Sequence, residues 1–181
     1  IEEFTENLGK NAKILDAGCG SGVHTNAFDE MGFKVIGIDI SNGMLREARK
    51  SFPSIDLRYG DLLNLHLNVK FDGIWAHASL VHFDSDDQIN KAMDNLYNVL
   101  KKGGVIHLLL RGRKSGERKN FVFNDKFFES QRFYCTFTHD EVRDLLEERN
   151  MTILKLYQYN EKDVNPIKQR DVSWVCALAR K

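Results

Sequence analysis

Short apolar runs alternate with helix-like segments along most of this chain, and no other feature of the sequence constrains its fold as strongly. The apolar runs cover residues 13–17, 34–38, 55–59, 71–76 and 105–110, and the helix-like segments cover residues 22–31, 42–50 and 86–100. Strands that alternate with helices in this way pair in parallel and bury both faces of their sheet. The pattern therefore predicts an α/β fold, a doubly wound sheet with helices on both faces.

The C-terminal part of the chain shows a different pattern. Thr138, followed three residues later by Glu141, is typical of a capping box, which predicts a helix that continues to about Arg149. Residues 152–159 and 172–179 alternate between apolar and polar side chains. This alternation predicts two antiparallel strands that close one edge of the sheet.

The length of the chain is that of one ordinary domain. It has 181 residues without internal repeats, which favours a single domain over residues 1–181. Because the sequence begins at Ile1 rather than at methionine, we expect that it is truncated at its N-terminus. No apolar run is long enough to span a bilayer and we find no signal peptide, so we expect no membrane association and a cytoplasmic location.

Charge and cysteine content argue against several functions. Lysine plus arginine (26) equals aspartate plus glutamate (26), so no overall field attracts the chain to nucleic acid. The three cysteines, Cys19, Cys135 and Cys176, are far apart and form no C-x-x-C motif. We therefore expect neither a disulfide framework nor a zinc site, and the sequence contains no other cluster of metal-ligand residues.

Residues 111–137 form a long connection without a clear helical or strand period. Connections of this length inside a compact domain are usually functional or disordered. This one is rich in phenylalanine and tyrosine, so disorder is a poor explanation. We expect a lid or a wall over a substrate. Its basic start, residues 111–119, is either a solvated loop or a site for an anionic acceptor.

A glycine-rich loop, Asp16-Ala-Gly-Cys-Gly-Ser-Gly22, follows the first apolar run and opens the first helix-like segment. Its bare backbone N–H groups at the start of a helix can approach a ligand closely. A phosphate-binding P-loop is excluded, because no lysine follows Gly22. The dinucleotide pattern G-x-G-x-x-G is not matched either, because its last position is Val23. Asp16 beside the loop would repel a pyrophosphate and attract a cationic ligand.

Asp39 ends the second apolar run, 21 positions after Gly18. A carboxylate at that place can accept hydrogen bonds from both hydroxyls of a ribose. Together the loop and this carboxylate suggest a nucleoside with a positively charged extension and no phosphate. S-adenosylmethionine meets that description, because it joins adenosine to a sulfonium and an amino acid.

With these motifs the chain resembles the class I S-adenosylmethionine-dependent methyltransferases, of the small bacterial methyltransferase-domain type. The motifs occur in the family's order: the loop at residues 16–22, Gly37-Ile-Asp39-Ile-Ser41, Gly60-Asp61, the stretch FDGIWAHASLVH at residues 71–82, and Leu100-Lys-Lys-Gly-Gly104. The resemblance covers residues 12–110 and implies a Rossmann-like, seven-stranded mixed sheet. The implied strand order is 3-2-1-4-5-7-6, with strand 7 antiparallel.

The resemblance also implies which residues contact the cofactor. Asp39 is expected to bind the ribose, and Asp61 either accepts the adenine amino group or caps the short segment that follows it. Met44 or Ile40 would pack on the adenine, although core packing explains Met44 equally well. The full set of implied cofactor contacts is Asp16, Gly18, Cys19, Gly20, Gly22, Asp39, Ile40, Met44, Gly60, Asp61, Leu62, His77 and Ala78.

Catalysis and acceptor binding leave weaker signals in the sequence. His82 follows the fourth apolar run, and it either removes a proton from the acceptor or is a structural histidine. Tyr134 is a second candidate catalytic residue. Arg111, Phe133 and Tyr134 are candidate acceptor-binding residues, and Arg111 would suit a carboxylate or phosphate. Cys19 is not expected to be a nucleophile, because nothing near it would lower its pKa.

The sequence leaves three functional hypotheses open. The leading one is a methyltransferase for a small molecule, with S-adenosylmethionine as cofactor and S-adenosylhomocysteine as product. The second is a methyltransferase for tRNA or protein that binds its substrate through the basic residues 111–119. The third is a module that binds S-adenosylmethionine without catalysis. The sequence specifies neither the acceptor nor the oligomeric state.

Overall fold

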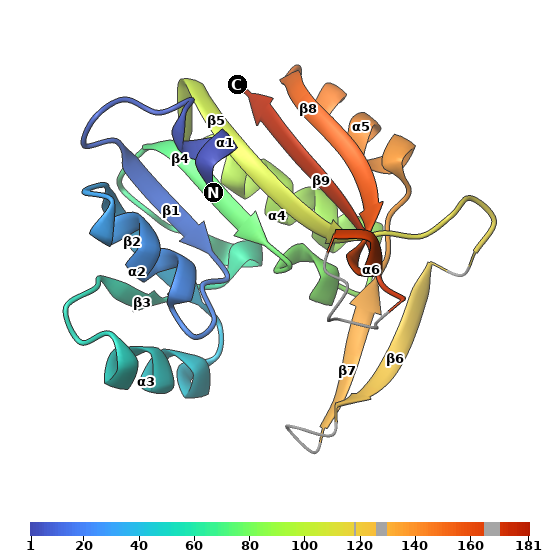
Figure 1. Cartoon of the computed structure of the whole chain (residues 1–181), viewed down its shortest axis with the longest axis horizontal. Helices are drawn as coiled ribbons and strands as arrows, with labels where there is room; N and C mark the ends of the chain where they lie inside the picture. The colour runs from blue at the N-terminus through green and yellow to red at the C-terminus, as the bar shows by residue number, and fades with distance from the viewer. Residues whose placement is uncertain (118, 126–129, 165–170) are drawn as a thin grey trace.

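The computed structural model describes residues 1–117, 119–125, 130–164 and 171–181. The strands of its large sheet are β1 (Lys13–Ala17), β2 (Lys34–Asp39), β3 (Leu57–Tyr59), β4 (Phe71–His77), β5 (Leu100–Arg111), β8 (Thr152–Asn160) and β9 (Ser173–Arg180). These seven strands lie in the order β3-β2-β1-β4-β5-β9-β8 (Figure 1). The first five run parallel, while β9 is antiparallel to both β5 and β8. Counted within this sheet, the order is the predicted 3-2-1-4-5-7-6, and that prediction is confirmed.

Helices cover both faces of the sheet, as predicted. They are α1 (Glu2–Thr5), α2 (Val23–Glu30), α3 (Asn42–Ser51), α4 (Asp86–Val99), α5 (His139–Glu147) and α6 (Glu161–Val164), with short 3-10 helices η1 (Leu62–Asn64) and η2 (Leu80–His82). Neighbouring residues of a strand point to opposite faces. In β1, Ile14 therefore joins the core with α1 and α2, while Leu15 joins the core with α4 and α5. Among the described residues, no helix is long and apolar enough to cross a membrane.

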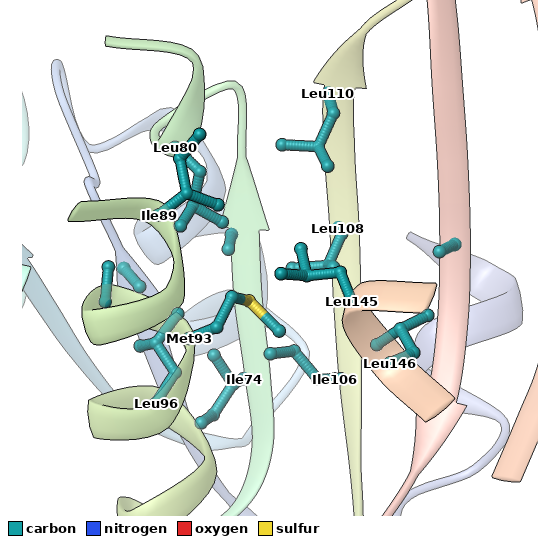
Figure 2. Packing of buried hydrophobic residues seen from close by; sticks show 14 of the residues in the cluster. Ile74, Leu80, Ile89, Met93, Leu96, Ile106, Leu108, Leu110, Leu145 and Leu146 are labelled. Atoms are coloured by element: carbon teal, nitrogen blue, oxygen red, sulfur yellow. The ribbon is translucent and has the colours of Figure 1, made fainter. Parts of the chain in front are cut away.

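The larger of these cores lies between the sheet and the helices α4 and α5 (Figure 2). Ile89, Met93 and Leu96 follow one another at helical spacing on α4 and are buried against the strands. On α5, the buried Leu146 contributes to the same core. The capping box predicted at Thr138 is present, so α5 begins where the sequence indicates.

The start of β5 differs from the sequence prediction, which placed the end of the preceding helix at Leu100 and the strand from Val105. Helix α4 ends at Val99, and β5 already begins at Leu100. The pairing of β4 with β5 is irregular, with Phe71 opposite Leu100 and Gly73 opposite Val105. The glycines and lysines of residues 101–104 are thus accommodated within the strand, as an irregularity of its register.

Residues 111–137, for which the sequence shows no period, contain a β-hairpin. Strands β6 (Asn120–Asp125) and β7 (Ser130–Cys135) pair antiparallel as a separate two-stranded sheet beyond the C-terminal end of β5 (Figure 1). The sequence did not predict them, because residues 126–129 include no glycine, proline or asparagine to signal a turn. The two ends of this segment meet, since the Phe137 N–H donates to the Arg111 carbonyl oxygen at 2.8 Å.

Candidate functional site

A cavity of about 500 Å³ opens at the C-terminal ends of β1 to β4. In sheets of this kind, ligands bind at the point where the strand order reverses, which here lies between β1 and β4. The cavity is lined by Gly18, Gly20, Asp39, Ile40, Ser41, Met44, Gly60, Asp61, Leu62, Ala78, Ser79, His82, Phe83 and Phe133. Because the strands lie side by side in the order β3-β2-β1-β4, the wall follows that order from Asp61 at one end to His82 at the other.

The glycine loop after β1 is shaped by close contacts on two sides. Gly18 and Gly22 have φ angles of +83° and +79°, which residues with a side chain rarely adopt. A Cβ on Gly18 would lie 2.4 Å from the Cβ of Ser79, so the loop meets the turn after β4 without room for a side chain. A Cβ on Gly22 would lie 3.2 Å from the Cβ of Ala48 in α3. Gly18 lines the cavity, whereas Gly22 allows the start of α2 to pack closely against α3.

Asp39 connects the loops that follow β1 and β2. One carboxylate oxygen accepts a hydrogen bond from the Gly20 N–H at 2.8 Å, and the other accepts one from the Ser41 N–H at 2.8 Å. An ionised carboxylate can accept about four hydrogen bonds, so these two leave capacity for a ligand. Ile40 and Met44 line the cavity beside it. The residues predicted to contact the ribose and the adenine thus lie on the same wall of the cavity.

Asp61 has one of the two roles between which the sequence could not decide, the cap of the short segment that follows it, while its contact with adenine stays a prediction. Its Oδ1 accepts a hydrogen bond from the Leu63 N–H at 2.8 Å, so it caps η1. Its Oδ2 accepts a hydrogen bond from the Asn64 side chain at 2.8 Å. The residue also lines the cavity, together with Gly60 and Leu62. The cap fixes the carboxylate at the cavity wall.

Asp16 lies beneath the glycine loop and does not line the cavity. Its side chain is 1% exposed, and its Oδ2 accepts a hydrogen bond from the Thr25 hydroxyl at 2.6 Å. Burial raises the pKa of Asp16 to about 7. The side chain of Cys19, within the loop, is also buried, and burial raises the pKa of its thiol to about 12, which disfavours the nucleophilic thiolate. The predicted contacts of these two residues with the cofactor remain predictions.

His77 belongs to a column of stacked rings on the sheet face that carries α1 and α2. Its ring centre lies 4.5 Å from that of His24 and 5.5 Å from that of Trp75. Trp75 in turn stacks on His107, with 3.7 Å between the ring centres. Burial and the neighbouring His24 lower the pKa of His77 to about 4. The side chain of His77 therefore points into this column, while the next residue, Ala78, lines the cavity.

The candidate acceptor residues come together at the end of the cavity near β4 and β7. His82 Nδ1 lies 3.2 Å from the carbonyl oxygen of Phe133, and its ring centre lies 5.0 Å from that of Tyr134. The guanidinium of Arg111 lies over the same Tyr134 ring, with Cζ 5.4 Å from the ring centre. His82 and Phe133 line the cavity, whereas Arg111 lines a neighbouring cavity of about 700 Å³.

Three cavity residues were not predicted from the sequence: Ser41, Ser79 and Phe83. Ser41 stands inside the motif that contains Asp39, so its place in the wall could have been inferred from that motif. Ser79 and Phe83 flank η2, a short helix that has no apolar period to reveal it. In the described part of the chain, no three side chains of His, Cys, Asp or Glu are grouped so that they could hold a metal ion.

Comparison with known proteins places this geometry in a family. The model of the methyltransferase domain family matches residues 14–104. A dTDP-3-amino-3,4,6-trideoxy-alpha-D-glucopyranose N,N-dimethyltransferase of Streptomyces venezuelae is 29% identical over 96 residues, which are 52% of this chain and 40% of that protein. A malonyl-[acyl-carrier protein] O-methyltransferase of Enterobacter lignolyticus is 32% identical over 96 residues, which are 52% of this chain and 37% of that protein. The matched regions thus cover well under half of either relative.

A solved structure extends the similarity to the whole chain. The crystal structure of a SAM-dependent methyltransferase from Methanosarcina mazei has a TM-score of 0.85 and covers 100% of this chain and 97% of its own, at 19% sequence identity. At that identity the likeness concerns the fold, and it includes the seven-stranded sheet. The predicted fold class and the predicted cofactor, S-adenosylmethionine, are confirmed at the level of the family. The chain belongs to the methyltransferase domain family, the class I S-adenosylmethionine-dependent methyltransferases.

Proposed function

We propose that this chain transfers a methyl group from S-adenosylmethionine to a small-molecule acceptor. The observation that carries the proposal is the order of groups along the cavity wall. Asp61 lies at the end of β3, Asp39 at the end of β2, Gly18 after β1 and Ala78 after β4. Adenine, ribose and amino acid would meet these groups in turn, and the acceptor would enter near His82.

The chemistry of the wall fits this cofactor. None of the described residues that line the cavity is a lysine or an arginine, while Asp39 and Asp61 both are acidic. A pyrophosphate bound near the glycine loop would meet no lysine or arginine among these described lining residues to balance its charge. A phosphate-free nucleoside with a sulfonium meets no such penalty. The cavity volume of about 500 Å³ is also in the range usual for a ligand of this size.

When bound, S-adenosylmethionine supplies a methyl group already activated by its sulfonium. The chain then has to hold and orient the cofactor and the acceptor, a task that requires few specialised catalytic side chains. Asp39 would fix the ribose, and Phe133 would cover the reacting end and exclude water. His82 could remove a proton from the acceptor, because a neutral imidazole that donates from Nδ1 to the Phe133 carbonyl has its basic lone pair on Nε2.

Names of relatives support a small acceptor. The relative from Streptomyces venezuelae is named for a sugar substrate, and the one from Enterobacter lignolyticus for a malonyl group on a carrier protein. The alternative, a tRNA or protein substrate docked on residues 111–119, has less support from the contacts. Within this basic stretch Arg113 pairs with Glu141, and Lys119 pairs with Asp86. Two of its cations are therefore already engaged inside the fold.

Calorimetry tests the cofactor, and product formation tests the reaction. We expect saturable binding of S-adenosylhomocysteine and none of NADH, which would distinguish this site from an oxidoreductase. Release of S-adenosylhomocysteine from S-adenosylmethionine is then followed with panels of sugars, acids and amines. Failure to bind S-adenosylhomocysteine at millimolar concentration would refute the proposal. Tight binding without turnover on any acceptor would favour a non-catalytic module, and activity on tRNA that falls steeply with salt would favour the nucleic-acid alternative.

A further inference from the structure

A second cavity, of about 700 Å³, neighbours the one assigned to the cofactor. Arg111 lines it from the end of β5, Asn160 from the end of β8, and Ser173 from the start of β9. Because β9 runs antiparallel to β5 and β8, these three positions lie at the same edge of the sheet as the C-terminal ends of β1 to β4. We call the two hollows the basic cavity and the cofactor cavity.

The two cavities differ in charge. The charged residues among the described lining of the basic cavity are the cations Arg111, Arg113, Lys114 and Lys162 and the acids Glu117, Asp163 and Asp171. Two of the acids are already engaged, because Glu117 accepts a hydrogen bond from the Lys114 N–H at 2.8 Å and Asp171 pairs with Lys162 at 3.2 Å. The described lining of the cofactor cavity holds two aspartates and no lysine or arginine. An anionic group is therefore better accommodated in the basic cavity.

Arg113 is a cation whose hydrogen-bonding capacity the fold uses only in part. Its side chain is 10% exposed, and its Nη2 pairs with Glu141. Its Nε is also buried, yet it has no hydrogen-bond partner among the described residues. A buried N–H without an acceptor costs free energy. An anion in the basic cavity would supply an acceptor to this guanidinium after a small rotation of the side chain.

Arg111 connects the basic cavity with the end of the cofactor cavity where the acceptor is expected. Its guanidinium is half-buried, and burial lowers its pKa. Its Cζ lies 5.4 Å from the centre of the Tyr134 ring, and the same ring centre lies 5.0 Å from that of His82. His82 lines the cofactor cavity and Arg111 the basic cavity, so Tyr134 contacts one residue of each. A small molecule with one end near His82 can thus extend past Tyr134 to Arg111.

We propose that the basic cavity binds a phosphate or carboxylate group of the methyl acceptor, which makes the acceptor an anionic small molecule. The inference rests on the function proposed above and narrows its substrate class. The guanidinium of Arg111 can donate two parallel hydrogen bonds to either group, and the exposed Lys114 adds a second cation. The group that receives the methyl would lie at the other end of the acceptor, beside His82.

The first experiment measures binding of the anion alone. Inorganic phosphate and acetate are titrated separately into the wild type at constant ionic strength, with chloride as the replaced ion, and thermal unfolding is followed. We expect a saturable rise of Tm with the anion that the basic cavity accepts, phosphate or the carboxylate of acetate. Phosphate also stabilises proteins by exclusion from their surface, so only the saturable part counts. No saturable rise with either anion would overturn the proposal.

Three variants locate the effect. Arg111→Gln should raise the apparent Kd of the anion about 10-fold and Lys114→Gln about 3-fold, because the first cation is half-buried and the second exposed. The exposed Lys114 also keeps the test valid if Arg111→Gln fails to fold. Arg143→Gln is the control, since it removes the same charge from the exposed surface of α5 and should bind as the wild type. Equal effects of all three variants, or no effect of any, would mean binding at the general surface and would overturn the proposal.

The second experiment compares acceptors in matched pairs, sugar phosphates with their parent sugars and carboxylic acids with their amides. Release of S-adenosylhomocysteine should occur with the anionic member of a pair, and Lys114→Gln should raise its KM about 3-fold with kcat unchanged. Turnover of the neutral member at an equal or higher kcat/KM would overturn the inference. A wild type that binds the anion at this site but does not bind S-adenosylhomocysteine would instead refute the proposed function, because the anion titration requires no cofactor.

Discussion

Replacing Asp39 by alanine examines the ribose contact and the loop structure at the same time. In the structure the carboxylate accepts hydrogen bonds from the Gly20 and Ser41 N–H groups, both at 2.8 Å, and it faces the cavity. The variant would therefore remove the proposed ribose contact, and it removes the hydrogen bonds by which Asp39 joins two loops. The two effects are separable, because one appears in binding and the other in unfolding.

The size of each effect follows from the contacts. Hydrogen bonds from ribose hydroxyls to a charged acceptor contribute about 1.5–3 kcal/mol, so the Kd for S-adenosylhomocysteine should rise roughly 10-fold to 150-fold. Asp39 is half-buried, and water can reach the two N–H groups once the carboxylate is gone. We expect an accompanying loss of stability of about 1–2 kcal/mol, which for a domain of this size lowers Tm by a few degrees, roughly 2–4 °C per kcal/mol.

The assay is calorimetric titration of wild type and Asp39→Ala with S-adenosylhomocysteine and with its 2′-deoxy analogue. If the carboxylate binds the ribose, loss of the 2′-hydroxyl weakens binding to the wild type but hardly changes binding to the variant. Asp39→Asn serves as the control, since its amide oxygen can still accept one of the hydrogen bonds. Equal affinities of wild type and Asp39→Ala for S-adenosylhomocysteine would refute the ribose assignment.

Other perturbations lead to expectations of the same kind. Gly18→Ala adds a Cβ only 2.4 Å from the Cβ of Ser79, at a residue with a φ of +83°. We expect this variant to be less stable by about 1–3 kcal/mol in urea unfolding and to bind S-adenosylhomocysteine more weakly. A free energy of unfolding equal to that of the wild type would contradict this geometry. Burial lowers the pKa of His77 from 6.5 to about 4, so between these values the unfolded chain binds more protons than the folded one, and stability is lost as the pH falls. The free energy of unfolding of His77→Gln, measured by urea unfolding, should therefore decline less steeply than that of the wild type from pH 6.5 to pH 4. If the free energies of the two proteins decline in parallel with pH, His77 is not a buried neutral imidazole. Leu146→Ala opens a cavity in the core beneath α5, where Leu146 is 0% exposed, and should cost about 2–5 kcal/mol in urea unfolding; a cost below about 1 kcal/mol would show that the core there is loosely packed.

Sheet order and helix positions could be predicted because they depend on patterns that repeat along the chain. Strands such as residues 13–17 are bounded apolar runs, and the capping box at Thr138 gives a local start signal. The β6–β7 hairpin was missed because residues 111–137 show no apolar-polar alternation that would predict strands. The early start of β5 at Leu100 was missed because its Lys-Gly stretch is equally typical of a helix end.

The carboxylates of the site could be predicted for a related reason. Asp39 and Asp61 follow strands, and parallel strands end at the same edge of a sheet. Which way a side chain points at that edge depends on the parity of the strand and on the turn that follows. His77 enters the ring column because it lies two positions after Trp75 on β4, so both side chains are on the same face of the sheet. Ser79 meets Gly18 after Ala78 has adopted a left-handed conformation, and a non-glycine residue gives no sign of this in the sequence.

The hairpin of β6 and β7 is joined to the domain at its base and also along β7, where His82 Nδ1 lies 3.2 Å from the Phe133 carbonyl oxygen. The Phe137 N–H donates to the Arg111 carbonyl oxygen at 2.8 Å, and the Arg113 N–H donates to the Phe137 carbonyl oxygen at 2.9 Å. A segment whose two ends are hydrogen-bonded to each other in this way can be exchanged for another segment or redesigned, while β1 to β4 keep their packing. Under the proposed function, we expect exchange of this hairpin to change the end of the cavity that Phe133 and His82 line, and with it the choice of acceptor.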